Sequence, residues 1–311
     1  MTVSPAFQPA GACWICGHEE LERFHRARLD FAIWKDQDPE LAAYTGETVW
    51  LSRCPQCGFA QPDRLPALPR YFERIYDQQW SQEWVAQEFE ASYKDLIFRR
   101  ILDSLSRRLG PDRRALLDVG SHAGRFLQLA RDAGWRAEGI ELNPRTAAYA
   151  ARQTGAPVHR IRAEHLSELG TRFDAVTMTD VLEHVPEPLP ILSSARRVLT
   201  AGGWIAVKVP CGPVQRLKEA GRARLRPGYR ATLADNLVHV SHFSPHALRQ
   251  ALARAGFADI DLEVAPPECP PGIGASRLLR LMVYGLGRTV PFALHTALAL
   301  HLQAFARNPG L

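Results

Sequence analysis

The sequence predicts an α/β fold with a mainly parallel sheet, preceded by a small cysteine-rich module. The main evidence for the sheet lies from residue 114 onward, where short apolar runs alternate with amphipathic helical segments. Repeated βα units of this kind form parallel sheets with helices on both faces. The evidence for the module is a pair of C-x2-C-G turns near the start of the chain.

Composition places the chain among globular proteins. Its 311 residues are 46% apolar and 23% charged, which excludes collagen-like, coiled-coil and wholly disordered chains. No apolar run reaches the ~18 residues that cross a bilayer. The first residues lack the basic patch and apolar stretch of a signal peptide, so we expect a cytoplasmic protein.

Four of the six cysteines form two matched turns, Cys13-x-x-Cys16 and Cys54-x-x-Cys57, each followed by glycine. Two such turns supply the closed tetrahedral site that suits structural Zn²⁺. The 37 residues between the pairs exceed the ~15–20 of compact zinc ribbons. Disulfides and a redox C-x-x-C are the alternatives, and a reducing compartment disfavours the disulfides.

We expect three regions along the chain. Residues 1–65 form the zinc-binding module, and residues 66–110 form a linker and helical cap. Three prolines within 61–70 indicate the linker. An apolar stripe with helical spacing from Phe89 to Leu109, ended by Gly110-Pro111, indicates the cap. Residues 111–311 form the main domain. This domain carries a basic insert over 211–236 and a helical insert over 265–299.

Apolar runs in the main domain set its expected strands, and caps and breakers set its helices. A helix ending at Leu199 is broken by Ala201-Gly202-Gly203, and a helix capped by Ser244 runs to Ala255. Other helices end at Ala133 and span Pro144–Thr154. The expected strands are Arg114–Val119, Arg136–Ile140, Val158–Ile161, Phe173–Met178, Trp204–Val209, Ala258–Val264 and Leu300–Ala306.

The loop after the first expected strand carries a ligand-binding pattern. Gly120 and Gly124 follow Asp118 and let backbone approach a ligand beside a helix N-terminus. His122 breaks the G-x-G-x-x-G dinucleotide fingerprint. Glu141 ends the second strand, where an acid commonly accepts hydrogen bonds from ribose hydroxyls. Loop and acid together indicate a nucleoside-containing ligand at the carboxyl ends of the strands.

Four sequence blocks resemble class I S-adenosylmethionine-dependent methyltransferases. In order, they are LLDVGSHAGRFL, GIELNP, FDAVTMTDVLEHVPEP and LTAGGWIAVKVP, and they span residues 115–210. The paired cysteine turns resemble a zinc-carrying subgroup among bacterial sugar, polysaccharide and natural-product methyltransferases. The resemblance implies a Rossmann-like seven-stranded sheet with an antiparallel last strand, and S-adenosylmethionine and Zn²⁺ as cofactors.

The resemblance also implies roles for individual residues. The loop would surround the methionine part of the cofactor, Glu141 would bind the ribose, Ala163 and Glu164 would meet adenine, and Thr179 and Asp180 would lie beside the sulfonium. The full expected cofactor set is Asp118, Gly120, Ser121, His122, Gly124, Glu141, Leu142, Ala163, Glu164, Thr179 and Asp180. Two residues depart from the family pattern. His122 replaces a common glycine, and Arg162 stands where an aspartate often contacts adenine.

The expected reaction is methyl transfer to a small molecule such as a sugar, a polysaccharide precursor or a natural product. Thr179-Asp180 stands where enzymes that methylate base or amide nitrogen often carry Asn/Asp-Pro-Pro-Tyr, so oxygen is our first choice of acceptor atom and carbon the second. His239 and His242 precede a helix cap and are candidates for a general base. The alternative is that they hydrogen-bond the loop backbone.

The charge distribution bears on partners. The net charge of +5 equals the excess of residues 213–230, whereas residues 1–65 carry −3. We expect Arg222 and Arg224 to attract an anionic small substrate, with solvated surface as the alternative. The acidic module argues against nucleic acid as a partner.

Other readings of the chain remain open at this point. An apolar stretch over 278–299 indicates packing on the core or a homodimer interface, and contact with a membrane surface is less favoured. An RNA methyltransferase using the zinc module is one alternative function. A non-catalytic protein that binds adenosylmethionine is another, in which His122 and Arg162 would mark decay of the site.

Overall fold

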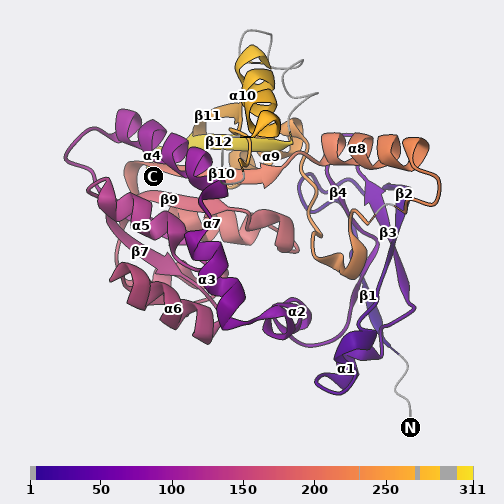
Figure 1. Ribbon diagram of the computed structural model, residues 1–311. Coiled ribbons are helices and arrows are strands. Elements are labelled where there is room, and N and C mark those ends of the chain that lie inside the picture. The colour runs from indigo at the N-terminus through magenta and orange to yellow at the C-terminus, as the bar shows by residue number, and fades with distance from the viewer. Residues whose placement is uncertain (1–4, 231, 270–273, 288–299, 311) are drawn as a thin grey trace. The chain divides into compact units, whose positions relative to one another are not determined.

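The computed structural model describes residues 5–230, 232–269, 274–287 and 300–310 (Figure 1). The chain divides into two compact units. The first comprises residues 1–80, 182–188 and 210–250, and the second comprises 81–181, 189–209 and 251–311. None of the helices within the described residues is long and apolar enough to cross a membrane.

The second unit contains a seven-stranded sheet in the order β11-β12-β10-β9-β6-β7-β8. Neighbouring strands from β10 to β8 are parallel, and β11 pairs with β12 in antiparallel register. This confirms the predicted fold class, including the antiparallel strand at the end of the chain. The strands are β6 (Ala115–Val119), β7 (Arg136–Ile140), β8 (Val158–His159), β9 (Phe173–Thr179), β10 (Leu199–Pro210), β11 (Ala258–Val264) and β12 (His301–Arg307).

The helices of the sheet unit follow the predicted alternation. Asn143 caps α6 by accepting hydrogen bonds from the backbone N–H groups of Arg145 and Thr146, and Gly155 ends the helix in the left-handed region. Ile97 and Ile101 of α4 pack with Leu127 of α5 in the core. The helices are α3 (Gln82–Glu90), α4 (Asp95–Leu109), α5 (Arg125–Asp132), α6 (Pro144–Thr154), α7 (Leu189–Val198) and α10 (Ala275–Gly287). Helix α9 (Pro245–Arg254) begins in the first unit and ends in the second.

The first unit is built on a three-stranded sheet in the order β2-β3-β4 and a separate pair, β1 with β5. Its strands are β1 (Phe7–Pro9), β2 (Glu22–Arg28), β3 (Thr48–Arg53), β4 (Ala60–Pro62) and β5 (Arg64–Pro66). Its helices are α1 (Pro39–Ala42), α2 (Tyr71–Gln79) and α8 (Gly212–Leu225). Short 3-10 turns in the two units span Ala32–Trp34, Ser92–Lys94, Ala163–Leu169, Leu182–His184 and Asp235–Leu237.

Three expected boundaries differ from the structure. Residues 61–70, expected as linker, contain part of β4 and all of β5, because Pro62 and Pro66 stand at strand ends where a missing N–H is tolerated. The stripe expected as one helix from Phe89 is split, since α3 ends at Glu90 and α4 begins at Asp95. In the expected insert over 265–299, α10 is helical, and residues 288–299 lie outside the described part of the chain.

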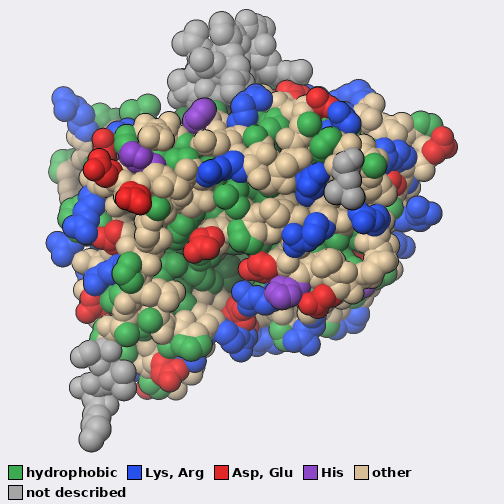
Figure 2. Space-filling model, turned by 180° about the vertical axis from the view of Figure 1, so that it is seen from behind, with side chains coloured by type: hydrophobic (Ala, Val, Ile, Leu, Met, Phe, Trp, Pro, Cys, Tyr) green, Lys and Arg blue, Asp and Glu red, His purple; other side chains and the backbone are tan. Residues whose placement is uncertain are grey.

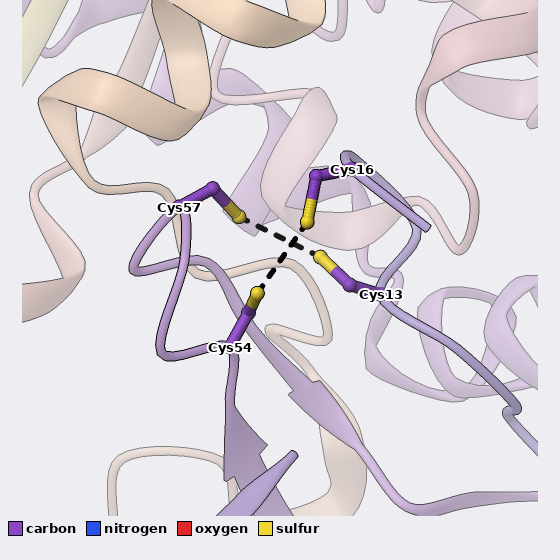
Figure 3. Close-up of side chains that lie close together, drawn as sticks. All are labelled: Cys13, Cys16, Cys54 and Cys57. Carbon is purple, nitrogen blue, oxygen red and sulfur yellow. Dashed lines mark hydrogen bonds between the residues drawn. The ribbon is translucent and has the colours of Figure 1, made fainter. Parts of the chain in front are cut away.

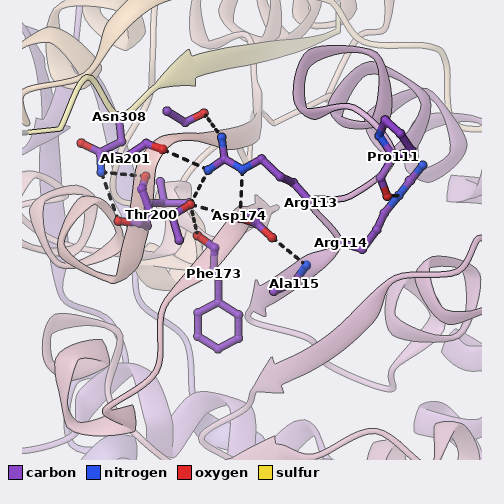
Figure 4. A network of polar contacts seen from close by, with 11 residues as sticks. Pro111, Arg113, Arg114, Ala115, Phe173, Asp174, Thr200, Ala201 and Asn308 are labelled. Carbon is purple, nitrogen blue, oxygen red and sulfur yellow. Dashed lines mark hydrogen bonds and ion pairs between the residues drawn. The ribbon is translucent and has the colours of Figure 1, made fainter.

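Strand β10 begins before Trp204, where we expected it to start, because a bulge accommodates the Ala201-Gly202-Gly203 breaker. Arg113 donates hydrogen bonds to the backbone carbonyls of Ala201 and Gly202 and forms an ion pair with Asp174 at 3.1 Å (Figure 4). The network offsets the backbone hydrogen bonds that the bulge removes from the ladder. Gly202-Gly203 therefore lies within an irregular part of β10 and does not separate the helix from the strand.

Candidate functional site

The four predicted zinc ligands converge in the first unit. The sulfur atoms of Cys13 and Cys57 lie 3.6 Å apart, those of Cys16 and Cys54 lie 3.4 Å apart, and all four fall within 4.8 Å of one another (Figure 3). Bonds of ~2.3 Å to one tetrahedral Zn²⁺ would place sulfur atoms at about this separation. The donor set therefore fits a structural zinc ion, and the geometry leaves no position open for catalysis.

Backbone hydrogen bonds shape both cysteine turns. The N–H of Gly17 bonds to the carbonyl of Cys13, and the N–H of Gly58 bonds to the carbonyl of Cys54. Gly58 has a φ of +73°, and an added Cβ there would lie 3.1 Å from Ser244 Oγ. The Ser244 hydroxyl in turn donates to the Cys57 carbonyl at 2.7 Å. The glycine after the second pair is thus needed for both its backbone angle and its small size.

In the second unit, the loop after β6 and the acid after β7 are joined. Glu141 Oε2 accepts a hydrogen bond from the His122 N–H at 3.1 Å, and Oε1 accepts one from the Asn143 N–H at 2.8 Å. Burial raises the pKa of Glu141. Each carboxylate oxygen has a second lone pair, so Glu141 can still accept hydrogen bonds from two vicinal hydroxyls.

Asp118 lies at the end of β6 and is only 3% exposed. Burial raises its pKa to about 7, although a 2.7 Å hydrogen bond from the Thr177 hydroxyl opposes that shift. A buried carboxyl in this position is costly to ionise without a cation. It can therefore bind an ammonium group more strongly than an exposed carboxylate would.

His122 adopts a left-handed backbone conformation with a φ of +47°. Such a conformation costs a non-glycine residue ~1–2 kcal/mol. The imidazole is in edge-to-face contact with Trp84 of α3, at 4.8 Å between ring centroids, and burial lowers its pKa. His122 therefore adopts the backbone turn that glycine would adopt, and the packing of its ring against Trp84 partly offsets the conformational strain.

Asp180 is held by two lysines that the sequence analysis did not single out. Lys94 Nζ lies 2.8 Å from Asp180 Oδ2, and the fully buried Lys208 contacts Asp180 Oδ1 at 2.5 Å and Glu268 at 3.1 Å. Burial would raise the pKa of Asp180, but the charges of Lys208 and Lys94 outweigh it and hold the pKa below its usual range. The sequence feature that could have predicted the buried Lys208 is its position within the apolar strand sequence WIAVKVP.

The remaining predicted cofactor residues also belong to the second unit. Ser121 Oγ and Thr179 Oγ1 are buried and have no hydrogen-bond partner among the described residues. Leu142 is 42% exposed, and Arg162 lies 3.8 Å from Glu164, which follows Ala163 at the start of a 3-10 turn. Unpartnered hydroxyls in a polar loop fit a ligand that supplies hydrogen bonds there, as S-adenosylmethionine would.

The two predicted base candidates belong to the first unit and differ in exposure. His242 is 2% exposed, and its backbone bridges to that of Ala60. His239 is half-buried and lies 4.7 Å from His184, ring to ring. His184 Nδ1 lies 2.7 Å from the Tyr76 hydroxyl. The half-buried His239 is the better placed of the two to meet a ligand.

A second group of metal-ligand side chains surrounds His239. Atoms of Glu183, His184 and His239 that could each bind a metal lie within 4.8 Å of one another. His184 Nδ1 also contacts the Val238 carbonyl at 2.6 Å. The group thus combines two imidazoles and a carboxylate, and its hydrogen bonds already fix the orientation of one imidazole.

The two predicted substrate arginines lie on the exposed side of α8. Arg222 contacts Glu219 at 3.1 Å, and Arg224 is exposed. Figure 2 shows Lys and Arg side chains spread over the visible face with acidic side chains among them. The role of Arg222 and Arg224 in substrate binding stays a prediction.

Comparisons with known proteins agree with this arrangement. A protein-family profile described as "Methyltransferase domain" matches residues 93–262, more than half of the chain. The solved structure of the plantazolicin methyltransferase BamL, in complex with a triazolic desmethylPZN analogue and SAH, has a TM-score of 0.52 at 12% identity. That likeness covers 78% of this chain and 96% of that one, and at this identity it shows the fold alone.

Curated relatives match part of the chain. A ubiquinone biosynthesis O-methyltransferase of Hydrogenovibrio crunogenus is 27% identical over 146 residues, which is 45% of this chain and 58% of that protein. The protein of the same name from Leptothrix cholodnii is 32% identical over 97 residues, or 29% and 41% of the two chains. The chain thus spans about half the length of the curated relatives it matches.

Proposed function

Because the chain belongs to the methyltransferase-domain family, we propose that it transfers the methyl group of S-adenosylmethionine to a hydroxyl oxygen of a small molecule. The observation that carries the proposal is the hydrogen bond between Glu141 and the loop at His122. It joins the expected ribose acceptor to the loop that would hold the methionine part. Two relatives named O-methyltransferases support oxygen over carbon as the acceptor atom.

The bound cofactor would supply an electrophilic methyl group, so the chain's own task is to bind, orient and exclude water. Asp118 would pair with the cofactor ammonium, and its low exposure would strengthen that pairing. Glu141 would fix the ribose through two hydroxyls. Asp180, already paired with two lysines, would keep its place beside the reacting centre and would not take up a proton there.

We assign proton removal from the acceptor hydroxyl to His239. Its half-buried ring is accessible, whereas His242 is 2% exposed and its pKa is lowered to about 4, chiefly by burial and by the charge of Arg216. A base with so low a pKa is a weak proton acceptor at neutral pH. The four-cysteine cluster would hold structural zinc and take no part in the chemical step.

Calorimetric titration with S-adenosylmethionine tests the cofactor site. We expect Glu141→Ala to weaken binding at least tenfold, because two ribose hydrogen bonds to a carboxylate are lost. Asp112→Asn is the matched control, since Asp112 is exposed in the turn before β6. Equal affinities of E141A and the wild-type protein would contradict the assigned ribose acceptor.

Mass spectrometry of methylated products tests the acceptor atom. Transfer to a panel of hydroxylated metabolites should give methyl ethers, and transfer to carbon would instead support the C-methyltransferase alternative. In single-turnover assays with saturating acceptor, His239→Ala should slow methyl transfer at least a hundredfold. An unchanged rate would exclude His239 as the base and leave cofactor binding untouched.

A further inference from the structure

One face of the β2-β3-β4 sheet in the first unit brings two histidines and an arginine together. In antiparallel pairing, residues directly opposite each other point to the same face. His25 pairs with Leu51 on β3, Arg53 pairs with Ala60, and Ala60 pairs with His242. Leu51 and Arg53 are two residues apart on one strand, so both histidines and Arg53 share this face.

Helix α8 approaches the same face. An added Cβ on Gly212, at the start of α8, would lie 3.2 Å from the His242 Cβ. One turn further along, the guanidinium of Arg216 lies 5.1 Å from the ring centroid of Phe24, the neighbour of His25 in β2. Arg216 is also close enough to His242 for its charge to lower the pKa of that imidazole.

Arg216 is half-buried and has no acidic partner among the described residues, whereas three neighbouring arginines are paired. Arg53 contacts Glu22 at 2.6 Å, Arg222 contacts Glu219, and Arg230 pairs with Asp235. The described residues give Arg216 no ion pair and no hydrogen bond. Its Nη1 is buried without a partner, although the side chain as a whole is only half-buried, and a polar group that loses water without gaining a hydrogen-bond partner lowers stability.

The two histidines of this face also have buried, unpartnered nitrogens. Nε2 of His25 and Nε2 of His242 make no hydrogen bond with the described residues. The His242 ring bonds to the backbone carbonyl of His239, which places its proton on Nδ1 and leaves a lone pair on Nε2. Arg216 thus supplies a cation that can bind an anion, and His242 Nε2 supplies a hydrogen-bond acceptor that lacks a donor among the described residues.

We propose that Arg216, His242 and His25 form a binding site for a phosphoryl group. A singly protonated phosphate supplies both missing partners, because its anionic oxygens accept from Arg216 and its O–H donates to His242 Nε2. A carboxylate or a sulfate offers no such proton. Nearby Glu219 and Asp235 already contact Arg222 and Arg230, so they do not take this place.

Calorimetric titration of the full chain with inorganic phosphate at about pH 6.5, where a phosphate keeps much of its second proton, tests the site. We expect one phosphate per chain, with sulfate binding at least tenfold more weakly. Arg216→Gln should weaken phosphate binding at least tenfold. Lys218→Gln, which removes an exposed cation from the same helix, should leave phosphate binding unchanged.

Thermal unfolding of Arg216→Met separates a binding role from a structural one. Without phosphate, R216M should unfold at the same temperature as the wild type or higher, because a half-buried cation without an acidic partner among the described residues is removed. Phosphate should raise the unfolding temperature of the wild type and leave that of R216M unchanged. Destabilisation of R216M, with no effect of phosphate on the wild type, would overturn the proposal.

Two further ligands identify the source of the phosphoryl group. A monoester such as glucose 1-phosphate that binds more tightly than inorganic phosphate indicates a phosphorylated substrate, and the reverse order indicates free phosphate. Equal affinity for sulfate and phosphate would overturn the role of His242. Because every readout is anion binding or stability, these results are independent of the proposed methyl transfer.

Discussion

Replacement of Asp118 by asparagine should change how the stability of the sheet unit depends on pH. Burial raises the folded-state pKa of this carboxyl to about 7, against 3.8 for an unperturbed aspartate. The folded protein therefore holds a proton on Asp118 over a pH range in which the unfolded chain has released it. The stability linked to this group is fully present below pH ~4 and is lost as the pH rises through ~7.

The size of the effect follows from the same two values. A difference of about 3 pKa units, at about 1.4 kcal/mol each, amounts to about 4 kcal/mol. Asparagine has the shape of the protonated carboxyl, and its side-chain oxygen can still accept the hydrogen bond from Thr177. Asp118→Asn should therefore gain stability relative to the wild type as the pH rises from ~4 to ~8, by about that amount.

Urea unfolding followed by tryptophan fluorescence, repeated across this pH range, gives the difference between wild type and variant at each pH. Titration of groups distant from Asp118 is common to both proteins and cancels in that difference, so the remainder reports Asp118 and its electrostatic neighbour Glu141. Asp112→Asn, at an exposed position, should run parallel to the wild type. A difference between D118N and wild type that stays constant with pH would show that burial does not shift the ionisation of Asp118.

Three other substitutions probe separate features. Cys54→Ser should unfold the module and abolish the one zinc ion per chain that elemental analysis would detect in the wild type. Cys269→Ser replaces a buried cysteine outside the cluster and should retain the metal. Equal zinc content in both variants would contradict the assigned ligands. Gly120→Ala should weaken S-adenosylmethionine binding at least tenfold, because its Cβ would lie 2.5 Å from Val181 Cγ2. Gly110→Ala has a similar positive φ in open space and should bind normally. Lys208→Ala should lower unfolding stability by ~3–5 kcal/mol by leaving buried Asp180 partly unpaired, and a loss no larger than that of Lys218→Ala would refute the pairing.

Local sequence patterns predicted most strands and helices of the sheet unit because each is defined by periodicity and end signals. The strand Arg136–Ile140 and the helix Pro144–Thr154 have the expected bounds. Residues 61–70 did not follow their composition, since strand pairing with distant segments placed Pro62 and Pro66 at strand ends. Proline content alone does not show whether a partner strand exists.

The sequence by itself determined the four-cysteine set, the glycine loop and the acid at Glu141, because each depends on spacing between near neighbours in the chain. Only the tertiary structure decided which side chains meet from distant positions. It paired Lys94 and Lys208 with Asp180, buried His242, and gave Arg216 no acidic partner among the described residues. These outcomes depend on strand register and helix packing, which bring together residues far apart in the chain and have no local signature.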